Sequence, residues 1–196
     1  MTSIREEITG KIRDELVAGK FQAGLALRET ELAERFGVSR GPIRDAFLQL
    51  SQEGFLAYQV NKGVTVRHPL IGEDREFIAS IRVQIELYIV GKGFDDLDDE
   101  GLSTIADALE ELKLACETGE VATIAKADMA FHETMLIACG GEDHVHYWRQ
   151  ICSRMLLTYT RLGSYKALYK EHVKIYKALK SKMKDVALAA INSNVT

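Results

Sequence analysis

The chain of 196 residues carries 25 Lys and Arg against 29 Asp and Glu, a net charge of −4, and 46% of its residues are hydrophobic. This apolar fraction is typical of a globular protein and excludes a disordered chain, and the length allows one large domain or two small ones. No run of about 18 apolar residues occurs, and the N-terminus has no apolar signal-peptide region, so we expect a cytoplasmic protein without a membrane span. The three cysteines, which stand among helical apolar residues, are predicted to be buried free thiols: Cys116, Cys139 and Cys152.

A helix with an N-terminal capping box is predicted at the start of the chain. Ser3 and Glu6 have the spacing at which each side chain can bond the backbone N–H of the other. An apolar residue then recurs at every fourth position and gives the helix one face for a core: Ile4, Ile8, Ile12 and Leu16.

Two helices that meet at a tight corner are predicted between Thr30 and Glu53. The first has one apolar face and ends at Gly37, where a left-handed residue is easiest to place. Ser39 is positioned to cap the second helix, and Pro42 lies in its first turn, where a missing N–H costs nothing. The apolar residues of the second helix repeat at helical spacing and must face a core: Ile43, Ala46, Phe47 and Leu50.

The second helix carries two arginines at its N-terminal end. Arg40 and Arg44 lie four residues apart, one turn along the helix, beside the small Gly41. A support helix, a corner and a second helix with guanidinium groups at its tip form a helix-turn-helix, in which arginine contacts phosphate or binds a guanine edge with two hydrogen bonds. A helical hairpin with surface arginines is the alternative at this point.

A two-stranded ribbon is predicted directly after this helix. Residues 55–60 and 64–66 have strand composition, and Asn61, Lys62 and Gly63 form the turn between them. A ribbon in this position is the wing of a winged helix, and Lys62 at its tip can contact backbone phosphate or the minor groove. Three elements in this order favour a DNA-binding domain over a simple hairpin.

The pattern changes at residues 68–72, where a proline followed by a glycine marks a linker. We therefore predict a first domain at residues 1–67 and a second at residues 73–196. Through residue 67, ten Lys and Arg face nine Asp and Glu, and the remainder has 15 against 20, so the acidic excess lies in the second domain. That domain is predicted to be an all-α bundle of six helices, at residues 73 to 91 or 93, 102–116, 121–139, 143–162, 164–181 and 184–192.

The third of these six helices carries a carboxylate and an imidazole on one face. Asp128 and His132 stand at i and i+4, and His172 lies forty residues further on, in the fifth helix. A carboxylate and two imidazoles on facing helices can bind a divalent metal such as zinc, nickel or manganese. A lone helical histidine is more often a core or surface residue, so the spacing alone does not decide.

The first domain resembles the DNA-binding domain of the GntR family of bacterial transcription regulators. The resemblance rests on FGVSRGPIRDAFLQLSQEGF, preceded by LRETELAE and followed by VNKGVTV. It implies a winged helix-turn-helix that binds double-stranded DNA, and a homodimer follows because such a domain binds two half-sites of a pseudo-palindrome. One departure is Thr30, which stands where the family often has a DNA-contacting arginine. The implied DNA-contacting positions are Thr30, Ser39, Arg40, Gly41, Arg44, Lys62 and Gly63.

The second domain resembles the FCD effector domain of the FadR-like group of this family, in its smaller, VanR-like branch. The segments IRVQIE, DMAFH and EH carry this resemblance, which implies a small-molecule effector and a metal held by Asp128, His132 and His172. Asn194 departs from the pattern, because it stands where metal-binding members have a third histidine, and asparagine is a poor zinc ligand. Three interpretations stay open: a metal site of reduced affinity, which we favour, a metal-free pocket in which the three side chains bind the effector, and a vestigial site.

Two arginines are candidates to bind an effector carboxylate, each through two parallel hydrogen bonds. They are Arg82 on the opening helix and Arg154 on the fourth helix of the bundle. The alternatives are a salt bridge from Arg82 to Glu86, one turn along the helix, and a solvated position for Arg154.

The sequence thus predicts a mainly α protein, with an N-terminal winged helix-turn-helix followed by an all-α, FCD-like bundle. We expect a DNA-binding regulator and not an enzyme, with an organic acid as the small-molecule effector. A metal-dependent hydrolase that uses the Asp/His cluster is the alternative function, but no separate general base or nucleophile stands near it in a known motif. A helical scaffold whose winged domain binds protein is a third possibility.

Overall fold

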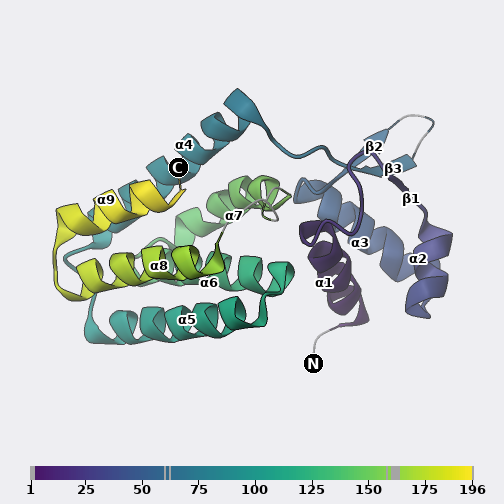
Figure 1. Cartoon of the computed structure of the whole chain (residues 1–196). Helices are drawn as coiled ribbons and strands as arrows, with labels where there is room; N and C mark the ends of the chain where they lie inside the picture. The colour runs from purple at the N-terminus through teal and green to yellow at the C-terminus, as the bar shows by residue number, and fades with distance from the viewer. Residues whose placement is uncertain (1–2, 60, 62, 158, 160–163, 196) are drawn as a thin grey trace. The chain divides into compact units, whose positions relative to one another are not determined.

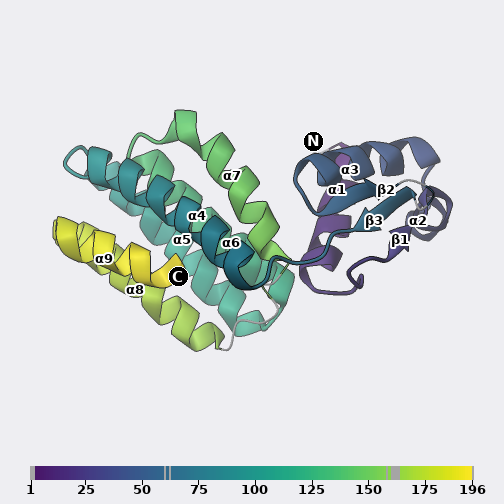
Figure 2. The same cartoon turned by 90° about the horizontal axis from the view of Figure 1, so that it is seen from above.

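The computed structural model of the chain describes residues 3–59, 61, 63–157, 159 and 164–195. The chain forms two compact units (Figures 1 and 2). One comprises Met1–Leu70 with Ser153–Thr160, and the other comprises Ile71–Cys152 with Arg161–Thr196. The described residues form nine helices and three short strands, so the prediction of a mainly α protein is confirmed.

The N-terminal unit contains three helices and a small antiparallel sheet. Its elements are α1 (Ile4–Val17), β1 (Ala26–Leu27), α2 (Glu29–Phe36), α3 (Arg40–Gln52), β2 (Leu56–Gln59) and β3 (Gly63–Val66). The strand order is β1-β3-β2, with Tyr58 opposite Val64 in the ribbon that β2 and β3 form. The predicted capping box of Ser3 and Glu6 is present at the start of α1. The pairing of β1 with β3 was not predicted, because two residues are too few to show a strand pattern.

The corner between α2 and α3 is formed as predicted, except for its cap. Gly37 ends α2 in the left-handed region, with φ of 66° and ψ of 35°. Ser39 occupies the N-cap position of α3, but its side chain makes no capping hydrogen bond, so that expectation was wrong. Pro42 removes one of the two possible donors, because a cap accepts from the second or third N–H of the helix, and the third residue here is a proline without one.

The second unit is a bundle of six helices. They are α4 (Gly72–Gly93), α5 (Asp99–Thr118), α6 (Val121–Ala138), α7 (Glu142–Leu156), α8 (Tyr165–Lys180) and α9 (Lys184–Val195). The consecutive helices α5 and α6 pack against each other, and so do α8 and α9. Contacts of α5 with α8, and of α4 with both α9 and α6, close the bundle. The helix predicted at 143–162 ends at Leu156, and residues 158 and 160–163 lie outside the described part. No helix among the described residues is long and apolar enough to cross a membrane.

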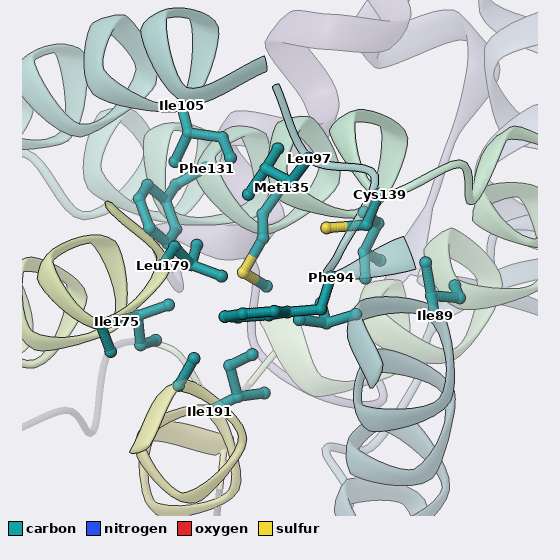
Figure 3. Packing of buried hydrophobic residues seen from close by; sticks show 14 of the residues in the cluster. Ile89, Phe94, Leu97, Ile105, Phe131, Met135, Cys139, Ile175, Leu179 and Ile191 are labelled. Atoms are coloured by element: carbon teal, nitrogen blue, oxygen red, sulfur yellow. The ribbon is translucent and has the colours of Figure 1, made fainter. Parts of the chain in front are cut away.

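A continuous apolar cluster fills the centre of this bundle (Figure 3). The ring of Phe94 lies in its middle, between Met135 on one side and Ile191 on the other. The helices approach closely at Gly93, where an added Cβ would lie 2.0 Å from the carbonyl oxygen of Cys139. This packing fixes α4 against the end of α6, the helix that carries two of the candidate ligands.

Candidate functional site

The tip of α3 presents the two arginines that the sequence singled out. Arg40 is the first residue of the helix and Arg44 lies one turn later, and 60% and 67% of their side chains are exposed. The opposite face of the helix is buried, with Ile43 and Leu50 both fully inaccessible. The helix is therefore anchored by its apolar side and leaves both guanidinium groups accessible.

Both guanidinium groups are paired with one carboxylate, that of Glu29. Its Oε2 accepts from Nη2 of Arg40 at 2.9 Å, and its Oε1 accepts from Nε of Arg44 at 3.4 Å. The hydrogen bonds from Arg40 and then Arg44 lower the pKa of Glu29 below its usual value, so it is ionised at neutral pH. Glu29 is not recognisable as a partner from the sequence, because its contact with α3 depends on the angle at the corner.

The other predicted DNA-contacting residues of the unit lie on its surface, where the structure describes them. Thr30, Ser39 and Gly41 are exposed, and Gly63 is half-buried with a φ of 75°. Lys62 lies outside the described residues. The hydroxyl of Ser39 is not used in capping, which leaves it accessible for a phosphate.

In the helical bundle, the structure brings together the three predicted metal-ligating side chains. Asp128 and His132 come from α6 and His172 from α8, and all three are buried. One ligand atom from each lies within 4.8 Å of the others. The Nε2 atoms of the two imidazoles are 3.2 Å apart, and Oδ1 of Asp128 is 2.7 Å from Nε2 of His172.

The hydrogen bonds behind the two imidazoles fix which nitrogen faces the centre. Nδ1 of His172 lies 2.8 Å from the carbonyl oxygen of Leu168, which can only accept, so Nδ1 carries the proton. Nδ1 of His132 lies 2.9 Å from Oε2 of Glu86. Although burial raises the pKa of Glu86, His132 and Arg82 hold it well below its usual range, so this carboxylate also accepts. Since Nδ1 of each ring is bonded to an acceptor outside the centre, both Nε2 atoms face the centre, which is the orientation of metal-ligating histidines.

A buried carboxylate oxygen, Oδ1 of Asp128, completes this centre. Its contact with Nε2 of His172 is a close ion pair that does not meet hydrogen-bond geometry. Burial lowers the pKa of His172, but the adjacent Asp128 raises it by more. Two imidazole nitrogens and one carboxylate oxygen that face the same point are a donor set that fits a divalent metal.

Glu86 connects this centre to a second buried charge. Its Oε1 accepts from Nε of Arg82 and from Nε1 of Trp148, both at 2.7 Å, and its side chain is fully buried. Arg82 thus forms the salt bridge that the sequence analysis kept as the alternative, and its guanidinium also lies 5.7 Å from the ring centroid of Trp148. The sequence predicted only the Arg82 pair of Glu86, because the other partners lie 46 and 62 residues away.

Two further predicted residues are engaged in other contacts. The amide Nδ2 of Asn194 donates to Oε2 of Glu171 at 3.2 Å. Arg154 belongs to the segment that groups with the N-terminal unit, where its Nη1 donates to the carbonyl oxygen of Gly54 at 2.9 Å.

Two protein-family models match the chain, one for each part. The model of the bacterial regulatory proteins of the gntR family matches residues 4–66, and the FCD domain model matches residues 77–195. The second match alone covers more than half of the chain and contains all of the buried centre.

Individual relatives agree with these matches. The uncharacterized HTH-type transcriptional regulator YdhC of Bacillus subtilis is 31% identical over 176 residues, which cover 86% of this chain and 77% of YdhC. The gluconate operon transcriptional repressor of Bacillus licheniformis is 24% identical over 197 residues, or 94% of this chain and 79% of the repressor. The structure of McbR/YncC of E. coli has the same fold, with a TM-score of 0.79, 22% identity and coverage of 100% of this chain and 94% of that one. The chain belongs to the GntR family of bacterial transcription regulators, with a DNA-binding helix-turn-helix followed by an FCD effector domain.

Proposed function

We propose that this GntR regulator binds a pseudo-palindromic operator as a homodimer in the cytoplasm and responds to an organic acid together with a divalent metal. Membership of the family supports the DNA-binding and effector-binding parts of this proposal, and argues against the hydrolase that the Asp/His cluster also suggested. A helix-turn-helix that binds two half-sites requires two copies of the domain, about one helical turn apart.

The exposed tip of α3 supports DNA contact through Arg40 and Arg44. Both guanidinium groups retain most of their surface, and their pairing with Glu29 does not bury them. We propose that they contact bases in the major groove, that Ser39 contacts phosphate, and that Lys62 and Gly63 contact the minor groove.

The proposed effector site rests on one observation, the convergence of Asp128, His132 and His172 on a common point in the buried core. These three residues would hold zinc, nickel or manganese, and Glu86 behind His132 would orient the ring. Such an ion, when bound, supplies a Lewis-acid centre with open positions for a carboxylate. Because the amide of Asn194 is bonded to Glu171, a metal affinity below that of a three-histidine site is expected.

An organic acid is the effector class that this donor set favours. The name of one relative is gluconate operon transcriptional repressor, and gluconate is a carboxylic acid. Arg82 and Arg154 are the two arginines proposed for the carboxylate, but the first is paired with Glu86 and the second with Gly54. We therefore assign carboxylate recognition to the Asp/His centre. An effector that releases DNA must bind the DNA-bound form less tightly, by linkage.

Two measurements test this proposal. Metal analysis of the protein after mild purification, with and without a chelator, is expected to show a divalent ion that the chelator removes together with effector binding. No stoichiometric metal and unchanged effector binding on chelation would reject the metal site. The DNA upstream of the gene is expected to bind in a salt-dependent titration and to be released in a screen of organic acids; a duplex that never binds would reject the operator proposal.

A further inference from the structure

The carboxylate of Glu29 lies against the tip of α3, the helix that is proposed to contact DNA. Glu29 is the first residue of α2, but its side chain lies against the first turn of α3 and pairs with both arginines there. Arg40 and Arg44 are like charges at i and i+4, an arrangement that is destabilising by itself. The carboxylate offsets this repulsion and restricts the rotamers of two long side chains that are otherwise exposed.

The contacts of Glu29 lie on one side of each guanidinium. It accepts from Nε and Nη2 of Arg40, at 3.3 and 2.9 Å, and from Nε and Nη2 of Arg44, at 3.4 and 3.5 Å. No described residue accepts from Nη1 of either group, so this side is available to another acceptor. A guanidinium has five N–H donors in a rigid plane, so fixing one edge also fixes the direction of the other.

We propose that Glu29 is a specificity-determining positioning residue, which directs Arg40 and Arg44 toward base edges and cancels one of their two charges. This inference rests on the proposed DNA contact of the two arginines. It extends that proposal because it assigns the balance between specific and non-specific binding to an acidic residue outside α3.

The physical reason is that charge and geometry act on different parts of DNA affinity. Attraction to phosphate does not depend on the DNA sequence, but it does depend on salt. The logarithm of the binding constant falls with the logarithm of the salt concentration, with a slope of about −0.9 for each phosphate neutralised. Base contacts depend on the direction of the donors. A carboxylate that pairs with two arginines therefore weakens binding to random DNA, while it aligns the donors that distinguish one sequence from another.

The chain provides a matched control in Glu31. Both acids lie in the first turn of α2, so the variants Glu29→Gln and Glu31→Gln remove the same charge from the same helix end. Among the described contacts Glu31 pairs only with Arg28, at 3.6 Å. The side chain of Glu31 is 69% exposed and that of Arg28 is 74% exposed. A purely electrostatic effect of the lost charge would therefore appear in both variants.

The experiment uses the full-length protein. An operator is first selected from a pool of random-sequence duplexes, and the dissociation constants for this operator and for a random duplex are then measured at several salt concentrations. Thermal unfolding, monitored by circular dichroism, identifies a temperature at which all variants are folded. For Glu29→Gln we expect the ratio of specific to random affinity to fall about tenfold, and the salt slope on random DNA to steepen by about 0.9. For Glu31→Gln we expect a ratio within about twofold of the wild type, because its exposed pair is screened.

Equal ratios for the two variants would overturn the role of Glu29. A wild-type protein that selects no sequence and binds no duplex would instead overturn the proposed DNA contact itself, so the two failures are distinguishable.

Discussion

The variant Glu86→Gln tests the buried charge network behind the Asp/His centre. In the structure this carboxylate accepts from Arg82, Trp148 and His132, and it is fully buried, whereas only 7% of the Arg82 side chain is exposed. A neutral amide keeps the volume but leaves the guanidinium of Arg82 without its counter-charge. Breaking a buried ion pair on one side costs about 3–5 kcal/mol, because a buried charge stays uncompensated.

Urea unfolding measures this loss. Trp148 is the only tryptophan of the chain and lies in the network itself, so its fluorescence reports the unfolding of the helical bundle. With an m-value of about 2 kcal/mol/M, a loss of about 4 kcal/mol lowers the midpoint by about 2 M at unchanged m. The double variant Arg82→Met with Glu86→Gln removes the orphaned charge as well, and it is therefore expected to be more stable than Glu86→Gln alone.

The matched control is Glu133→Gln, which removes a carboxylate from a surface pair in the same bundle. Its partner Arg149 is 57% exposed and Glu133 is 28% exposed, so a cost of about 0–1 kcal/mol is expected. A midpoint for Glu86→Gln within the range of this control, or a double variant less stable than the single one, would refute the reasoning.

Three further variants test other parts of the molecule. Arg40→Ala is expected to cost about 1–3 kcal/mol on the selected operator and to flatten its sequence preference, and unchanged affinity in a titration would exclude Arg40 from base recognition. A zinc concentration of about 100 times the dissociation constant is expected to stabilise the wild type by about 2.7 kcal/mol in a thermal shift assay, and His172→Ala is expected to lose this gain; an equal gain in both proteins would contradict the metal site. Gly93→Ala is expected to destabilise the bundle by about 1–3 kcal/mol in urea, because the new methyl group meets the Cys139 carbonyl, and an unchanged midpoint would contradict the close approach.

Two control variants accompany this set. His146→Ala, at an exposed position of α7, is expected to retain the stabilisation by zinc. Gly91→Ala adds a methyl group on the same helix as Gly93, but its nearest neighbour is Leu188 Cδ1 at 3.9 Å. It is expected to leave stability unchanged or to raise it by up to about 1 kcal/mol, from helix propensity.

The helices could be predicted from the sequence because their signals are local. An apolar residue at every third or fourth position locates each helix, and local signals mark its ends, such as the Ser3–Glu6 box at the start of α1 and Gly37 at the end of α2. The two-residue strand β1 has no local pattern, and it forms only because β3 lies beside it. The missing cap of Ser39 shows how two signals that are each sound can conflict, because a proline in the first turn lacks an N–H that a cap residue would bond.

The candidate centre could likewise be predicted only where its signals are local. Asp128 and His132 share a face by helical spacing, His172 was named as a third candidate on a facing helix, and a resemblance to a known domain supported the set. Glu86 and Glu29 were not recognised as partners of these sites, since their contacts depend on how helices pack. Spacing along the chain does not determine the angle at which α2 meets α3, or the depth at which α4 meets α6.

The burial of the Asp/His centre has a consequence for how an ion would exchange with the surrounding solution. Asp128, His132 and His172 lie inside a packed bundle, with 7% of the Asp128 side chain and none of the imidazole surface exposed. Solutes reach such atoms only when the helices separate, and openings of a packed core are rare events. Loading and release of an ion at this centre would therefore be limited by the opening of the bundle, so an ion acquired during synthesis would outlast brief changes in the metal supply of the cell.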